Sequence, residues 1–268
     1  MVQSPGWISG QGSHTHARRT RQLQQPRTID MEPEQDTPLE SPFNALPPLI
    51  VALALLIIGI EAFFQLAEHG VIGGPTAIGW RLDAVNQYGY SPNVLDRVLT
   101  GGDYSFDMLI RFVTYPFINM ALTQVAFCAA LTLALGKFTA EFYGSFKTGA
   151  VYFLTAVAGA VVYGLLVDGQ FPLLGGFTPV YGLIGAYTYA LWLQLGKRNE
   201  NQLKAFRLIG VLLFLQLVFG IVSGFLYEVA PPPTWIAELS GFAAGFLMAV
   251  LLAPGGWGRF LARMRQRA

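Results

Sequence analysis

The stretch that opens the fourth of six long apolar runs reads Gly175-Gly176-Phe177-Thr178-Pro179-Val180-Tyr181-Gly182-Leu183-Ile184-Gly185-Ala186-Tyr187. About 20 apolar residues cross the hydrocarbon layer of a bilayer, and each run reaches or approaches that length. Of the 268 residues, 53% are hydrophobic and 12% are charged, which is about half the charge of a soluble domain. The sequence therefore predicts an all-α polytopic membrane protein with six transmembrane helices. The predicted spans are 48–67, 117–135, 149–167, 178–195, 208–226 and 235–252.

The distribution of lysine and arginine predicts the orientation of these spans. The two terminal segments and the loops after the second and fourth spans carry 14 of the 17 such residues. The other three, Arg81, Arg97 and Arg111, lie in the long loop after the first span. Because lysine and arginine concentrate in cytoplasmic loops, we expect both termini in the cytoplasm. The sequence shows no signal for a eukaryotic organelle, so we expect a multi-pass protein of a bacterial inner membrane.

The chain divides into three segments by composition. Residues 1–47 are polar and without apolar periodicity, which predicts disorder; within them we expect 1–30 to be an over-extended gene start, because Met31 opens a plausible beginning. Residues 48–254 form the predicted membrane domain, in which 68–110 is a long external loop rich in aromatic residues that we place at the membrane interface. Residues 255–268 form a basic cytoplasmic tail.

Polar side chains recur at one depth of the predicted bundle. Spans 2, 4 and 6 run in the same direction, so residues near their starts lie at the same membrane face. Span 1 runs the opposite way, so Glu61, late in that span, approaches the same face. A carboxylate in hydrocarbon costs several kcal/mol, and such residues usually face a bundle interior or water. We therefore expect these groups to line a cleft near the outer face. They are Glu61, Asn119, Gln124, Thr178 and Glu238.

Small residues predict where the spans pack closely. Gly182 and Gly185 lie on one side of the fourth span, and Gly241 and Gly245 lie one turn apart on the sixth. Small side chains let helix backbones approach in a membrane, where the hydrophobic drive between helices is weak. We expect these four glycines to be packing positions.

Four short motifs, in the expected order along the chain, resemble the rhomboid family of intramembrane serine proteases. The resemblance extends from about Arg111 to Pro254 and implies a six-helix fold. It includes an arginine-containing entry to the second helix, an acidic–Gly-Ser turn after it, the body of the nucleophile helix, and the Ala-His–small–Gly helix. These motifs correspond to Arg111–Phe117, Glu141–Ser145, Val180–Ala186 and Ala237–Gly245.

The same resemblance implies that the catalytic groups are replaced. Aligned from Tyr181, the position of the nucleophilic serine holds Phe177, and the position of the general-base histidine holds Glu238. The glycine after the serine is replaced by Thr178. The positions of the oxyanion-hole groups and of an outer histidine hold Gln124, Cys128 and Asn119.

A substitute catalytic pair is the first alternative. A shift of one residue would make Thr178 the nucleophile and Glu238 its base, giving an intramembrane serine- or threonine-type peptidase. Pro179 lacks the N–H that an oxyanion hole would use there. The only histidines, His14, His16 and His69, all precede the second span, so a Ser–His dyad in the membrane core is not expected.

We therefore expect a rhomboid-like pseudoprotease that binds or escorts membrane-protein clients through a cleft. Two further alternatives stay open: a structural subunit of a membrane complex, and a small-solute or proton pathway that uses Glu61 and Glu238. The single cysteine excludes an intramolecular disulfide, and we expect no metal, no cofactor and no nucleic-acid partner. The expected partners are the bilayer and transmembrane clients, and the cleft candidates are Asn119, Gln124, Cys128, Tyr181 and Glu238.

Overall fold

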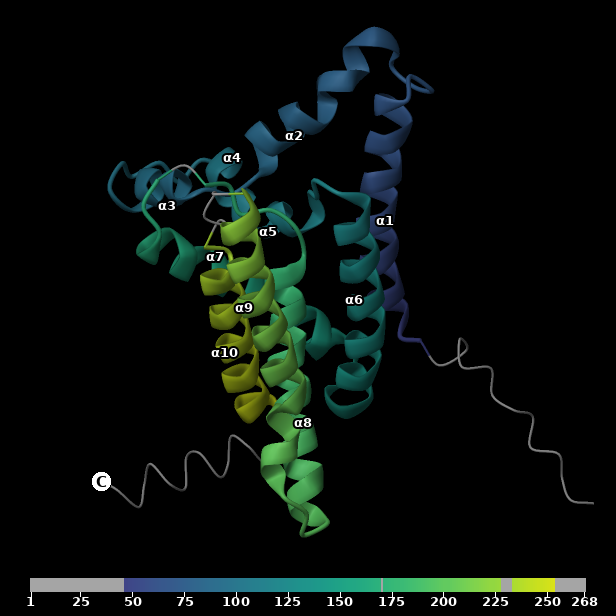
Figure 1. The fold of residues 1–268 in the computed structure, drawn as a ribbon, viewed down its shortest axis with the longest axis vertical. Coiled ribbons are helices and arrows are strands. Elements are labelled where there is room, and N and C mark those ends of the chain that lie inside the picture. The colour runs from purple at the N-terminus through teal and green to yellow at the C-terminus, as the bar shows by residue number, and fades with distance from the viewer. Residues whose placement is uncertain (1–45, 170, 228–232, 254–268) are drawn as a thin grey trace, which may run out of the picture. The chain divides into compact units, whose positions relative to one another are not determined.

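The computed structural model describes residues 46–169, 171–227 and 233–253, and this part of the chain is helical throughout (Figure 1). It has no strand, only one isolated bridge between Tyr90 and Leu173. Six helices of 18 to 22 residues dominate it. They are α1 (Pro48–Glu68), α6 (Leu122–Tyr143), α7 (Ser145–Leu166), α8 (Phe177–Lys197), α9 (Arg207–Tyr227) and α10 (Trp235–Leu252).

Four of these helices, α1, α6, α7 and α10, are long and apolar enough to cross a membrane. The prediction of an all-α, multi-pass membrane protein is thereby confirmed. Each long helix overlaps one predicted span. The predictions for residues 1–45, including the suspected gene start, and for the tail after Ala253 concern residues outside the described part of the chain.

The second span is the one whose predicted bounds differ most from the helix. The apolar run starts at Phe117, but α6 begins at Leu122 and ends at Tyr143. Ile118 and Ala121 have extended backbones, and the carbonyl of Asn119 accepts a hydrogen bond from Arg81 instead of joining the helix. At the other end, α6 continues through the polar pair Lys137 and Glu141 until Gly144, whose φ of +94° favours glycine.

The loop between α1 and α6 is a chain of short helices. Figure 1 shows α2 leading from the end of α1 towards α3 and α4. The position of this loop, residues 68–110, at the membrane interface stays a prediction. The elements are η1 (Gly74–Gly79), α2 (Trp80–Tyr88), α3 (Pro92–Leu99), α4 (Phe106–Leu109), α5 (Arg111–Thr114) and η2 (Tyr115–Phe117).

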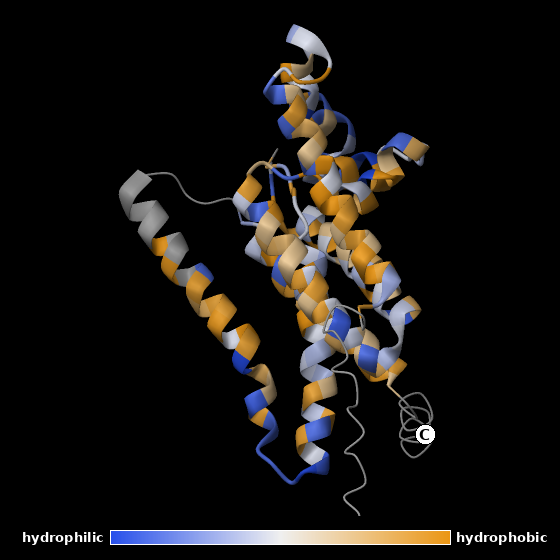
Figure 2. Cartoon of the chain, turned by 90° about the vertical axis from the view of Figure 1, so that its right-hand side faces the viewer, coloured by the Kyte–Doolittle hydropathy of each residue, from blue (hydrophilic) through white to orange (hydrophobic). Residues whose placement is uncertain are grey.

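Helix α8 is the centre of the bundle. It packs most extensively on α10 and also contacts α7 and α6. Most residues in its first half are buried. Helix α9 contacts α8 and η3 (Gln202–Phe206), and its residues Ile209, Leu212 and Leu213 pack against the core. Figure 2 shows a hydrophilic connection between α8 and α9 at the foot of the picture and the two helices diverging above it. The start of α8 is therefore held on three sides.

Candidate functional site

The start of α8 is the point where the polar groups meet. Gly175 precedes the helix with a φ of +86°, a conformation that L side chains rarely adopt. A Cβ added there would collide with the Gln124 amide and lie 2.9 Å from Oδ1 of Asn119. A Cβ at Gly176 would lie 3.7 Å from that of Cys128. The two glycines therefore let the backbone pass directly against three of the five cleft candidates.

Unused hydrogen-bonding capacity characterises this cluster. Asn119 is 1% exposed, and neither its Nδ2 nor its Oδ1 has a partner among the described residues. The hydroxyl of Tyr152, 3.3 Å from a Cβ built at Gly176, is likewise buried without a partner there. Gln124 is half-buried, and its Oε1 accepts a 3.4 Å bond from the N–H of Met120. Since buried polar groups are normally paired, these atoms form a polar site inside an apolar bundle.

Glu238 forms the second part of the site. It is 5% exposed at the start of α10, and Gln216 of α9 donates a hydrogen bond to its carboxylate. The side chains of Tyr181 and Thr234 are the other polar groups that face it. The other amide atom of Gln216, Oε1, is buried without a partner among the described residues. Glu238 thus links the first turns of α10 and α8 to the middle of α9.

The two positions that would carry a nucleophile do not present one to Glu238. Phe177 is half-buried at the first turn of α8. Thr178 is 1% exposed; its methyl group faces Gly159 and Gly241 on the neighbouring helices, and its hydroxyl faces Tyr115. No hydrogen bond joins Thr178 to Glu238 among the described residues. The geometry therefore supplies hydrogen-bond donors and acceptors rather than a nucleophile with its base.

Glu61 belongs to a separate charged network. It is 2% exposed in α1, and Arg81 of α2 contacts both of its oxygens, at 2.8 and 3.0 Å. Arg81 also donates to Glu68 at 2.6 Å and to the carbonyl of Asn119 at 2.7 Å. The hydrogen bond to Glu61 raises the pKa of the guanidinium, which therefore stays charged. Glu61 and Glu238 have different partners, so the structure offers no support for an acid pair.

The four packing glycines lie between α8 and its neighbours. A Cβ on Gly185 would collide with the backbone of Phe242, one on Gly241 would lie 2.5 Å from the carbonyl of Thr178, and one on Gly245 would collide with the carbonyl of Gly182. Gly182 itself faces Thr155 of α7. The backbones of α8 and α10 are thus in direct contact, which fixes Glu238 relative to Phe177.

Two hydrogen-bond partners are not predicted from the sequence. They are Gln216, which bonds to Glu238, and Arg81, which bonds to Glu61. Gln216 was visible as a polar residue in the middle of the fifth apolar run, which was a usable signal. Arg81 gave no such signal, because an arginine in an external loop is ordinary. Within the described residues no group of three His, Cys, Asp or Glu side chains could hold a metal ion.

Comparison with known proteins gives the same assignment as the fold. A sequence model of the Rhomboid domain matches residues 107–255, which is more than half of the chain. The chain is 26% identical to the mouse protein Rhomboid-related protein 3 over 147 residues and 24% identical to the human protein of that name over 147 residues. Each match covers 53% of this chain and 36% of the relative, so it spans about a third of the relatives' length. Together with the six long helices and the placement of α8 against α10, these matches show that the chain belongs to the rhomboid family.

Proposed function

We propose that this protein is a rhomboid without proteolytic activity that binds the transmembrane helices of other membrane proteins. The observation that supports it most is the pair of substitutions at the expected dyad, Phe177 and Glu238, together with the bond that already engages Glu238. A carboxylate that accepts a hydrogen bond from Gln216 and faces Tyr181 serves as a structural and recognition group.

The proposed topology has all six long helices crossing the membrane. Both termini then lie in the cytoplasm, because the terminal segments and the α6–α7 and α8–α9 connections carry most of the lysine and arginine. The start of α8 and the network of Arg81 lie towards the outer face. We place the protein in a bacterial inner membrane.

Client recognition would use the unpaired amides at the start of α8. Asn119 and Gln216 have buried atoms without partners among the described residues, and leaving such atoms unpaired costs about 1–3 kcal/mol each. A client helix with a polar residue or a helix break at this depth offers the missing partners. Helix α9 contacts the bundle near its beginning and through the bond of Gln216 to Glu238, so it is the element best placed to yield to a client.

Peptidase activity through Thr178 has less support. Its side chain is buried between α7 and α10, and its hydroxyl faces Tyr115. Attack on a peptide bond would require this hydroxyl to turn towards both a substrate and a base. The packing against Gly159 and Gly241 opposes that turn.

Site-specific photo-crosslinking in native membranes tests the client proposal. A photoreactive amino acid replaces Gln124, and the matched control replaces Leu247, which is 64% exposed on α10. We expect position 124 to capture an intact membrane protein and position 247 to capture lipid. If both positions capture only lipid, the client proposal is wrong.

A further inference from the structure

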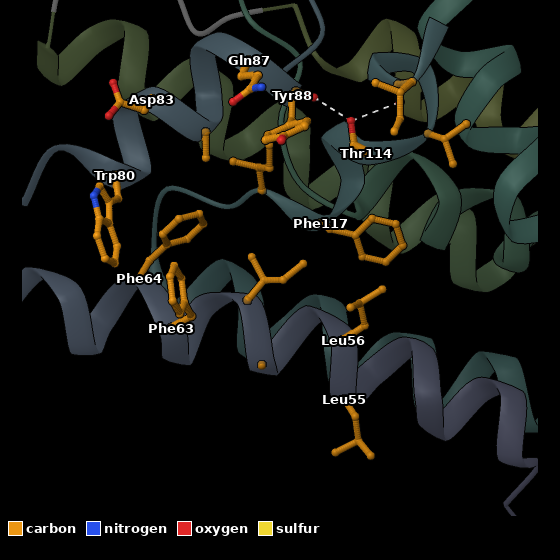
Figure 3. Close-up of a pocket in the computed structure, with 16 residues that line it drawn as sticks. Leu55, Leu56, Phe63, Phe64, Trp80, Asp83, Gln87, Tyr88, Thr114 and Phe117 are labelled. Atoms are coloured by element: carbon orange, nitrogen blue, oxygen red, sulfur yellow. Dashed lines mark hydrogen bonds between the residues drawn. The ribbon is translucent and has the colours of Figure 1, made fainter. Parts of the chain in front are cut away.

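An open cavity among the described residues lies away from the start of α8. It has a volume of about 910 Å³ and lies between α1, α2 and the α5–η2 segment (Figure 3). Its floor is the α1 surface that includes Leu55, Leu56 and Gly59. Much of this region precedes residue 107, where the match to the Rhomboid domain begins. The match therefore covers only the α5–η2 part of the lining.

The polar groups of this cavity are confined to one side. Figure 3 shows Asp83 and Gln87 on α2, opposite the aliphatic and aromatic side chains of α1. Asp83 is exposed and has no hydrogen bond or ion pair within the part of the chain that the structure describes. The hydroxyl of Thr114 is already used, since it donates to the carbonyl of Tyr88 at 2.9 Å. The lining thus combines one free negative charge with a long apolar floor.

The groove is held open by contacts between its two main walls. The rings of Phe63 and Trp80 stack with centroids 5.5 Å apart and planes 9° from parallel. Immediately beside them, Arg81 joins α2 to Glu61 and Glu68 of α1. Two independent contacts therefore fix α2 above α1 at this end, and the space between them is part of the folded structure.

The length of the α1 surface in this groove indicates what kind of molecule can bind there. From Leu55 to Phe64 the helix rises about 13 Å, which is close to half of the ~30 Å hydrocarbon layer. A client helix that crosses the membrane would need a groove of the full thickness. The acyl chains of a single leaflet need only half.

We propose that this groove binds one phospholipid of the outer leaflet that carries an ammonium headgroup, as phosphatidylethanolamine does. The acyl chains lie along α1 between Leu55 and Phe64, and the ammonium group binds the carboxylate of Asp83. Trp80 lies at the headgroup level, where tryptophan is enriched in membrane proteins. This inference goes beyond client binding and does not depend on it.

Native mass spectrometry of the full chain tests the proposal. The protein is released from nanodiscs that contain equal amounts of phosphatidylethanolamine and phosphatidylglycerol, and the retained lipids are counted. The decisive variant is Gly59→Leu, because a Cβ at Gly59 meets nothing within 4 Å and the larger side chain would fill the groove. The matched control is Gly210→Leu in α9, where a Cβ also meets open space.

We expect the wild type and Gly210→Leu to retain one phosphatidylethanolamine in preference to phosphatidylglycerol, and Gly59→Leu to lose it. Asp83→Asn should keep a lipid but reduce the preference by about threefold, as expected for one exposed charge. Equal retention by Gly59→Leu and wild type would overturn the proposal, as would a preference for phosphatidylglycerol.

If Gly59→Leu does not fold, photolabelling of the wild type tests the same proposal. A phosphatidylethanolamine with a photoreactive acyl chain is added to the wild type, and the labelled peptides are identified. Labelling concentrated on 55–64 and 80–88 supports the site. Labelling spread evenly over the exposed faces of α1, α7 and α10 would contradict it, and so would a photo-crosslinker at Ala84 that captures a second copy of the chain or another protein.

Discussion

Arg81 is the residue on which the outer part of the molecule depends most. Its guanidinium contacts two carboxylates and the Asn119 carbonyl while only 8% exposed. Removing charges from water is costly, and a buried ion pair is tolerated when nearly all its hydrogen-bonding atoms find partners. Here the guanidinium joins α1, α2 and the entry to α6. One side chain therefore positions the loop that carries Asn119 to the start of α8.

The substitution Arg81→Ala should destabilise the protein strongly. It leaves Glu61 buried without an opposite charge, with only the hydrogen bond from Gln65, and breaking a buried ion pair in this way typically costs about 3–5 kcal/mol. Thermal unfolding in detergent measures the loss. The matched control is Arg97→Ala, since Arg97 is exposed on α3 and makes no ion pair among the described residues. Similar melting temperatures for the two variants would show that the network does not hold the loop.

For individual residues, the sequence predicts where polar side chains lie better than it predicts which groups they bond to. The depth of Asn119 and Gln124 along the second span predicts their place near the start of α8, and the family resemblance adds Cys128. The structure brings all three against Gly175 and Gly176. The bonds of Arg81 to Glu61 and of Gln216 to Glu238 join residues 20 and 22 apart on different helices. No periodicity within one helix links such residues, so only the tertiary structure could supply them.

Among the helices, the close contact between α8 and α10 determines the geometry of the site. Three glycines bring the two backbones together: a Cβ on Gly185, Gly241 or Gly245 would meet the backbone of the other helix. Such contact allows dispersion forces to stabilise helix association where lipid is as apolar as the side chains. The contact also keeps Glu238 beside Tyr181, because both residues lie in the first turns of their helices.

A single methyl group at this contact should be costly. Gly245→Ala places a Cβ against the carbonyl of Gly182, so the helices must separate, and overpacking of this kind costs about 1–3 kcal/mol. Gly210→Ala adds the same methyl group where it meets nothing within 4 Å. We expect the melting temperature to fall for the first variant and to stay unchanged or rise for the second. Equal melting temperatures would mean that α8 and α10 are not in backbone contact.

The existence of the long helices was predictable, whereas some of their ends were not. Apolar length gave α10 its bounds and α1 its bounds to within one residue. Hydropathy failed at α6, because its first apolar residues form η2 and an extended segment held by Arg81. The order of short helices between α1 and α6 depends on tertiary contacts that aromatic content alone does not reveal.

The proposed topology of the whole molecule predicts where reporter proteins fused to it are active. A green fluorescent protein fused after Ala268 should fluoresce, and an alkaline phosphatase fused there should be inactive, because the carboxy terminus is expected in the cytoplasm. The same phosphatase inserted between Asp168 and Gly169, in the connection from α7 to α8, should be active. The opposite pattern at both positions would invert the proposed topology and place the start of α8 at the cytoplasmic face.

The central claim is that a rhomboid fold has been retained without its proteolytic chemistry. Labelling by a fluorophosphonate probe tests it most directly, since the probe reacts with an activated hydroxyl nucleophile. Membranes that contain the protein are treated in parallel with the same membranes that contain an active serine hydrolase. We expect the hydrolase to be labelled and this protein to remain unlabelled. Clear labelling of the wild type that disappears in Thr178→Ala would contradict the claim and establish Thr178 as a nucleophile.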